Sequence, residues 1–159
     1  YKTEHSEVAA LLASGETGLA MLPEPNVTAT MAKKEGLRIA LNLTEEWAKV
    51  SDTKLVQGCL IIRGEFYEQN KDAVNQFLKD YKASTDFVNT DVEAAAALLE
   101  QKEIIPAAAI AKRAIPNCNI VCITGEDMQR DAQGMLEVLF NANPKSIGGA
   151  LPGDDFYAR

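Results

Sequence analysis

The stretch Leu19-Ala20-Met21-Leu22-Pro23-Glu24-Pro25-Asn26 is an apolar run that stops at a proline–glutamate–proline corner. Its first four residues predict a short buried strand, since glycines precede them and a proline follows. Each proline holds the residue before it extended, so the Glu24 carboxylate lies on a stiff loop. Asn26 is the expected N-cap of a helix over residues 27–34. Ligands of open α/β sheets bind near such strand ends, which makes this corner a candidate binding site.

The segments around this corner predict an α/β layer followed by a mainly helical part. A helix over residues 7–13, which Gly15 is expected to end as a left-handed C-cap, precedes the strand. A second strand over 37–41 follows the next helix. This alternation is the signature of a parallel α/β arrangement. A further strand is predicted over 55–63, a short strand or extended segment over 120–123, and a short helix or loop over 44–50. Helices are predicted over 70–89, 93–101, 107–114 and 128–141, and the tail from residue 143 is predicted to be irregular. The first of these helices is amphipathic; the second is capped by Thr90-Asp91, and its alanine run at 94–97 permits close helix packing.

The composition limits the class of protein. The chain has 159 residues, of which 47% are hydrophobic, enough for one sizeable core in a single domain or two small lobes. Its net charge is -7, and no block of Lys or Arg could neutralise a phosphate backbone, so nucleic acid is not an expected partner. No run approaches the roughly 20 apolar residues of a membrane span, and no signal peptide is recognisable at the first residues.

The residues that usually carry catalysis are scarce. His5 is the only histidine, so a serine or cysteine triad has no usual base, and no nucleophile-elbow or phosphate-loop pattern occurs. The three cysteines at 59, 118 and 122 lack metal-ligand spacing and are expected to be buried, inert thiols. We therefore expect no enzyme activity, no cofactor and no metal. The local chemistry leaves Glu24 either as a ligand contact or as part of a surface turn without function.

Four segments of the sequence, at residues 8–25, 62–70, 73–81 and 143–157, resemble solute-binding proteins of ABC importers of the nitrate/sulfonate/taurine type, a group that includes thiamine-precursor binders. Residues 8–25 resemble the family's "A-L-L-x-G-E-x-D-x-A-x-x-x-E-P" segment. Residues 62–70 resemble its strand followed by "R-x-E-F", and residues 73–81 its "A-V-x-x-F-L-x-x-Y" helix. The tail from Asn143 to Tyr157 resembles the C-terminus of a subset of these proteins. One departure is Gly18, where the family often has an acidic residue.

The resemblance implies a partial type II periplasmic-binding-protein fold of the α/β class. Residues 1–54 would form the end of the second lobe, and residues 55–159 the crossover strand and the helical completion of the first lobe. Glu24, Pro25 and Asn26 are carried over as ligand-binding residues at the cleft. Because only the C-terminal portion is matched, half of the clamshell would be missing, and self-association or swapping through exposed apolar edges is expected.

The function that the resemblance implies is an extracytoplasmic binding component of an ABC importer. It would capture a small organic or anionic solute between two lobes without chemistry and pass it to the membrane permease. Its expected place is the periplasm, or the outer face of the membrane as a lipoprotein. Two alternatives stay open: an enzyme like thiamine-pyrimidine synthase on the same fold, and a stand-alone α/β regulatory or interaction domain.

Overall fold

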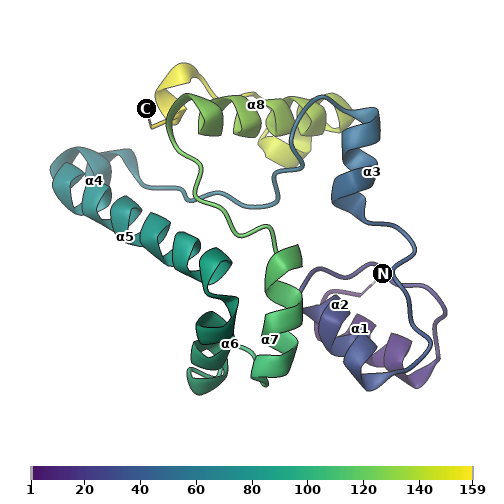
Figure 1. Cartoon of the computed structure of the whole chain (residues 1–159). Coiled ribbons are helices and arrows are strands. Elements are labelled where there is room, and N and C mark those ends of the chain that lie inside the picture. Colours follow the sequence, from purple (N-terminus) through teal and green to yellow (C-terminus); the bar gives the residue numbers. More distant parts are fainter. Residues whose placement is uncertain (1, 159) are drawn as a thin grey trace. The chain divides into compact units, whose positions relative to one another are not determined.

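The structure of the chain is a computed structural model that describes residues 2–158 (Figure 1). Throughout this part of the chain the regular elements are helices. In order they are α1 (His5–Ser14), α2 (Asn26–Lys33), α3 (Leu43–Val50), α4 (Gly64–Gln69), α5 (Lys71–Thr90), α6 (Val92–Gln101), α7 (Ala108–Ala114), the 3₁₀ helix η1 (Ile115–Asn117), α8 (Gly125–Ala142), and the 3₁₀ helices η2 (Pro144–Ile147) and η3 (Asp154–Phe156).

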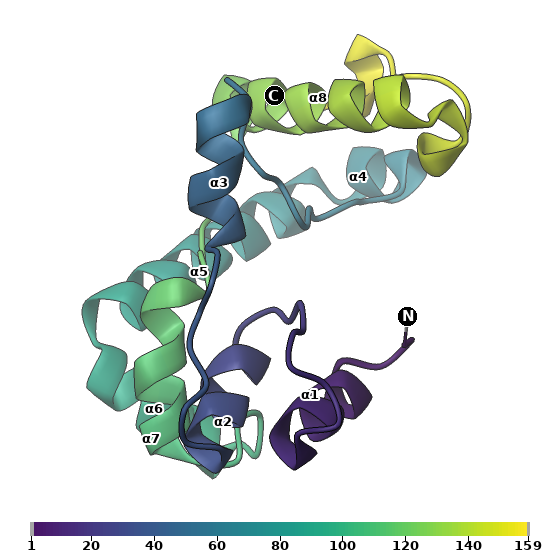
Figure 2. The ribbon, with the colours of Figure 1, turned by 90° about the vertical axis from the view of Figure 1, so that its right-hand side faces the viewer.

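The predicted α/β fold, a partial type II periplasmic-binding-protein fold, is therefore wrong. No β-strand and no sheet occur among residues 2–158. The stretches predicted as strands, 19–22, 37–41 and 55–63, lie outside every helix and run as irregular connections. The same holds for 120–123, which was predicted as a strand or an extended segment. Figure 2 shows the connections before and after α3 running as single threads.

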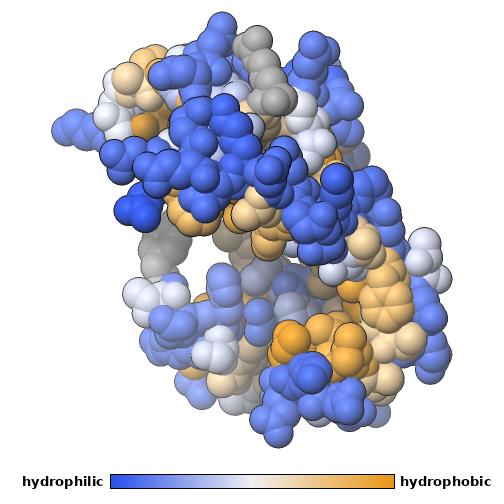
Figure 3. All heavy atoms as spheres, turned by 90° about the vertical axis from the view of Figure 1, so that its left-hand side faces the viewer, coloured by the Kyte–Doolittle hydropathy of each residue, from blue (hydrophilic) through white to orange (hydrophobic). Residues whose placement is uncertain are grey.

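The physical reason is that a strand exists only beside another strand, whereas a helix bonds its own backbone. Among the described residues, the backbone groups of 19–22 and 120–123 form no backbone–backbone hydrogen bond. The Ile120 carbonyl instead accepts a bond from the Asn89 side chain, at 2.9 Å. Apolar side chains of these stretches are exposed, and apolar surface is visible between polar areas in Figure 3. The apolar pattern identified extended segments but supplied no pairing partner.

The described residues divide into two compact units, each considered by itself. The first comprises the chain up to residue 38 together with residues 75–122. Its core is an alanine-rich contact between α6 and α7, which pack side by side. The predicted close packing of the alanine run is confirmed, since Ala95 and Ala96 are both buried. The core residues are Ala95, Ala96, Ile105, Ala111 and Ile115, with Val88, Val92, Leu99, Ala108 and Ile110 packed around them.

The same unit contains the corner and its neighbouring helices. Helices α1 and α2 lie side by side, and α2 also contacts α7. Gly15 ends α1 in the left-handed region, at φ 85°, as the sequence predicted. The predicted cap at Asp91 is also confirmed, because its Oδ1 accepts a hydrogen bond from Ala94 N at 3.0 Å. Local signals thus located these two helix ends, whereas the starts predicted for α1 and α8, at residues 7 and 128, lie two and three residues after those of the structure.

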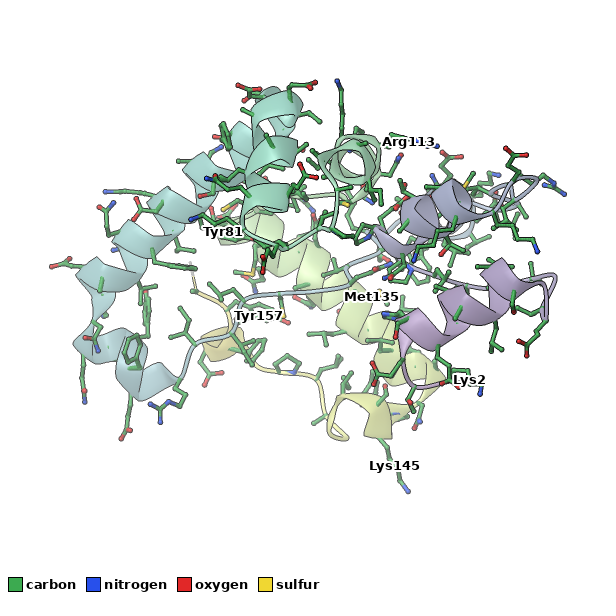
Figure 4. All side chains as sticks on the ribbon, turned by 90° about the horizontal axis from the view of Figure 1, so that it is seen from below. Lys2, Tyr81, Arg113, Met135, Lys145 and Tyr157 are labelled. Atoms are coloured by element: carbon green, nitrogen blue, oxygen red, sulfur yellow. The ribbon has the colours of Figure 1, made fainter. Side chains whose placement is uncertain are left out.

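The second unit comprises residues 39–74 and 123–159, of which the last described is 158. Here α8 packs against η2, and the indole Nε1 of Trp47 on α3 donates to the Thr53 carbonyl at 2.8 Å. Tyr157, labelled in Figure 4, is buried and meets Phe156 edge to face, with ring centroids 5.3 Å apart. Burial raises the pKa of the Tyr157 hydroxyl, with smaller contributions from Glu137 and Asp154. Few side chains of this unit are fully buried.

The units interleave along the sequence, because α5 begins in the second unit and continues in the first. The boundary predicted between residues 54 and 55 concerned two lobes of a longer α/β protein. It stays a prediction.

The close α6–α7 contact predicts that the core of the first unit tolerates larger side chains poorly. Ala111 has no exposed surface, so Ala111→Leu should overpack the contact and lower the free energy of unfolding by about 1–3 kcal/mol. The matched control is Ala109→Leu on the same helix, which is exposed and should change stability by less than about 0.5 kcal/mol. Urea denaturation followed by circular dichroism measures both. Equal losses would contradict this core.

Candidate functional site: the Glu24–Pro25–Asn26 corner

The predicted site residues form a turn that leads directly into α2. Glu24 and Pro25 make the turn, and Asn26 is the first residue of α2. The Glu24–Pro25 peptide bond is cis. All three residues are half-buried. The structure therefore places Glu24, Pro25 and Asn26 together; their role as ligand contacts stays a prediction.

The Glu24 carboxylate caps the helix that follows it. Its Oε2 accepts a hydrogen bond from Thr28 N at 3.1 Å, and its Oε1 accepts one from the Thr28 hydroxyl at 3.0 Å. A negative group at a helix N-terminus is favourable because the first backbone N–H groups carry partial positive charge. The capping prediction for Asn26 is wrong, since its side chain makes no cap and Glu24 takes that place.

The first turn of α2 has little donor capacity left for a ligand. Val27 N donates to the Pro23 carbonyl at 3.2 Å, and Ala29 N to the Pro25 carbonyl at 3.0 Å. With Thr28 N bonded to Glu24, the Asn26 N–H is the one early backbone donor of α2 without an acceptor among residues 2–158. A carboxylate has about four lone-pair sites, and Thr28 uses two of those on Glu24. The corner can therefore still accept hydrogen bonds better than it can donate them.

Cys118 lies within electrostatic reach of this corner. Burial raises the pKa of its thiol, and the Glu24 carboxylate raises it further by opposing a second negative charge. The thiol also donates to the Ala114 carbonyl at 3.2 Å. The expectation of buried cysteines is wrong, because Cys59 is exposed and Cys118 and Cys122 are half-buried. Nothing in the sequence pattern connected Cys118 with Glu24.

A hollow in the other unit, lined mainly by residues with polar side chains, was not predicted. It has a volume of about 460 Å³ and is lined by Thr53, Glu126, Gln129, Arg130, Gln133, Gly134 and Glu137. The Arg130 guanidinium is paired with Asp127 and with Asp131, the latter at 3.0 Å. These carboxylates raise the pKa of Arg130, which stays charged. They also balance its positive charge, so Arg130 is a poor binding site for an anion. Apart from Thr53, all lining residues lie on α8. The polar face of this helix was therefore the sequence feature from which the hollow could have been predicted.

The remaining chemistry-bearing residues stay dispersed. His5 is exposed at the first position of α1. Among the described residues, no group of three or more His, Cys, Asp or Glu side chains is arranged to hold a metal ion. No described helix combines the length and the apolar character that crossing a membrane requires.

Comparison with solved structures gives a likeness over nearly the whole chain. A crystal structure described as an ABC transporter from Parabacteroides distasonis matches 98% of this chain, with a TM-score of 0.73 and 20% sequence identity. The match covers 54% of that protein, so this chain spans about half its length. No protein-family model matches the chain. None of the curated protein sequences matches it either. The chain thus has a fold related to that of an ABC-transporter protein.

The cap at the corner can be tested by a double-mutant cycle. Glu24→Ala removes both acceptors of Thr28 and should lower the free energy of unfolding by about 0.5–2 kcal/mol. Thr28→Val removes the hydroxyl only, so the two changes should be non-additive in thermal denaturation. Glu35→Ala, at an exposed position of the same unit, is the control and should have little effect. Additive losses would show that the Glu24 carboxylate does not interact with the Thr28 hydroxyl.

The thiol of Cys118 provides a pH test of the corner. Its raised pKa favours the neutral thiol, so alkylation by iodoacetamide should need a higher pH in the folded chain than in urea. Glu24→Gln should move the folded profile toward lower pH, because it removes a negative charge; Glu35→Gln should not move it. Rates at each cysteine come from mass spectrometry of peptides. An unchanged profile in Glu24→Gln would mean that Cys118 does not sense Glu24.

Proposed function

We propose that the chain is part of the solute-binding component of an ABC importer. The observation that carries this proposal is the likeness, over 98% of the chain, to a protein described as an ABC transporter. The sequence resemblance to binding proteins of the nitrate/sulfonate/taurine type supports the same class independently. A fold alone does not define a function, so the proposal also depends on what the corner can bind.

Glu24 would contact the solute at the corner. Two lone-pair sites of its carboxylate remain for N–H or O–H groups of a small organic solute, and the Asn26 N–H offers one donor to an acceptor or anionic group. Thr28 already holds the carboxylate in place, so little side-chain freedom is lost on binding. Such contacts bind a molecule without any covalent step, and we propose binding rather than catalysis as the role.

The importer role also implies a location and a membrane partner. A binding component works outside the membrane, either in the periplasm or anchored as a lipoprotein, and transfers its solute to a permease. These two features are part of the proposal and follow from the role, not from a feature of residues 2–158.

Isothermal titration of the 159-residue chain against nitrate, alkanesulfonates and pyrimidines tests the proposal. We expect one class to bind with no product formed, and Glu24→Gln to weaken a donor-bearing ligand about 10-fold or more, as for hydrogen bonds to a charged group. Glu35→Gln is the matched control and should bind like the original chain. The proposal would be overturned if a ligand were converted to a product, or if none of the three classes bound.

A further inference from the structure

Two extended segments of the chain carry exposed apolar side chains. One is flanked by acidic residues at both ends, and the other by basic residues at both ends. Leu19–Leu22, here the acidic-ended segment, lies between Glu16 and Glu24. Leu55–Ile62, the basic-ended segment, lies between Lys54 and Arg63. Neither segment contains a charged residue. They belong to different units, and no ladder of backbone hydrogen bonds runs along either one within residues 2–158.

Large apolar side chains in both segments are mostly exposed. Leu19 is 80% exposed and Met21 77%, and in the other segment Leu60 is 58% and Ile61 74% exposed. Side chains of this size normally lie inside a protein, and each would gain about 1.5–3 kcal/mol on full burial. Uncharged windows with this composition and free backbone groups are typical sites of edge-to-edge pairing.

The flanking charges select which segments fit each other. Two copies of the basic-ended segment would bring Lys54 and Arg63 against like charges, and two acidic-ended segments would oppose glutamates. The acidic-ended segment against the basic-ended one gives opposite charges at both ends when the two run antiparallel, with Glu16 opposite Arg63 and Glu24 opposite Lys54. The two pairs of charges are separated by similar numbers of residues, so both ends can meet at once. Lys54, Arg63 and Glu16 form no ion pair among the described residues.

We propose that the chain binds a second copy of itself by pairing Leu19–Leu22 of one copy with Leu55–Ile62 of the other. Backbone hydrogen bonds would hold the two segments, and the charges at their ends would set the choice of partner. A second copy supplies the complementary segment that each unpaired segment lacks. Pro23 ends the pairing at one side, since it has no N–H to donate.

Light scattering after size exclusion tests the pairing from about 1 to about 100 µM chain, the range of weak interfaces. The mass should rise from monomer to dimer with concentration. Met21→Lys and Ile61→Lys should each keep the chain monomeric at every concentration. The matched control Ile104→Lys changes an apolar residue that is 68% exposed outside both segments, and it should dimerise normally. Circular dichroism confirms that each variant is folded.

A charge exchange separates this pairing from general stickiness. Arg63→Glu and Glu16→Lys should each weaken the dimer, and the double variant should restore it, since the opposite charges meet again. Exposed Cys59 lies inside the basic-ended segment, so its alkylation should slow as dimer forms. The proposal would be overturned if the chain stayed monomeric at every concentration, or if Ile104→Lys dissociated the dimer as much as Met21→Lys does. It would also be overturned if the double variant formed a weaker dimer than either single variant. Solute binding by the monomer would leave the proposed function intact.

Discussion

Every backbone N–H and C=O group needs a hydrogen-bond partner, and this requirement determines which segments of the chain become regular. A helix meets it within its own sequence, so the helices from α1 to α8 form wherever capping and periodicity allow. An extended segment meets it only through a neighbouring strand or water. Because no strand lies beside 19–22 or 120–123 among residues 2–158, these segments stay irregular and their apolar side chains stay exposed.

Stability is accordingly concentrated where helices pack on helices. The contact of α6 with α7 depends on small side chains, which let the backbones approach and leave little room for larger ones. The ion pairs of the chain contribute less, because most join exposed partners such as Lys82 and Asp86, at 2.8 Å. The second unit has fewer buried side chains, and its α8 contacts depend on close approach: a Cβ at Gly134 would lie 2.9 Å from Thr53 Cγ2.

The corner at Glu24 combines a structural and a candidate binding role in one carboxylate. Thr28 fixes the carboxylate on α2, and this fixed position is what a binding site requires. The same contact consumes donors of the helix N-terminus, so the corner suits hydrogen-bond donors of an organic solute better than a bare anion. The proposed function uses the half-buried polar turn, whereas the proposed dimer uses the exposed apolar segment before it together with the charges of Glu16 and Glu24.

The sequence by itself predicted most of the helices, but not α4, and it predicted some of their ends. Gly15 and Asp91 act through bonds within a few residues, so their roles could be predicted, as could the amphipathic α5. It also identified the residues of the corner, but not that Glu24 rather than Asn26 would cap α2. Only the tertiary structure decided that the four apolar stretches are not strands, and that Cys118 lies near enough to Glu24 for the carboxylate to raise its pKa. These features depend on contacts between segments far apart in the chain, which a local pattern of apolar residues does not encode.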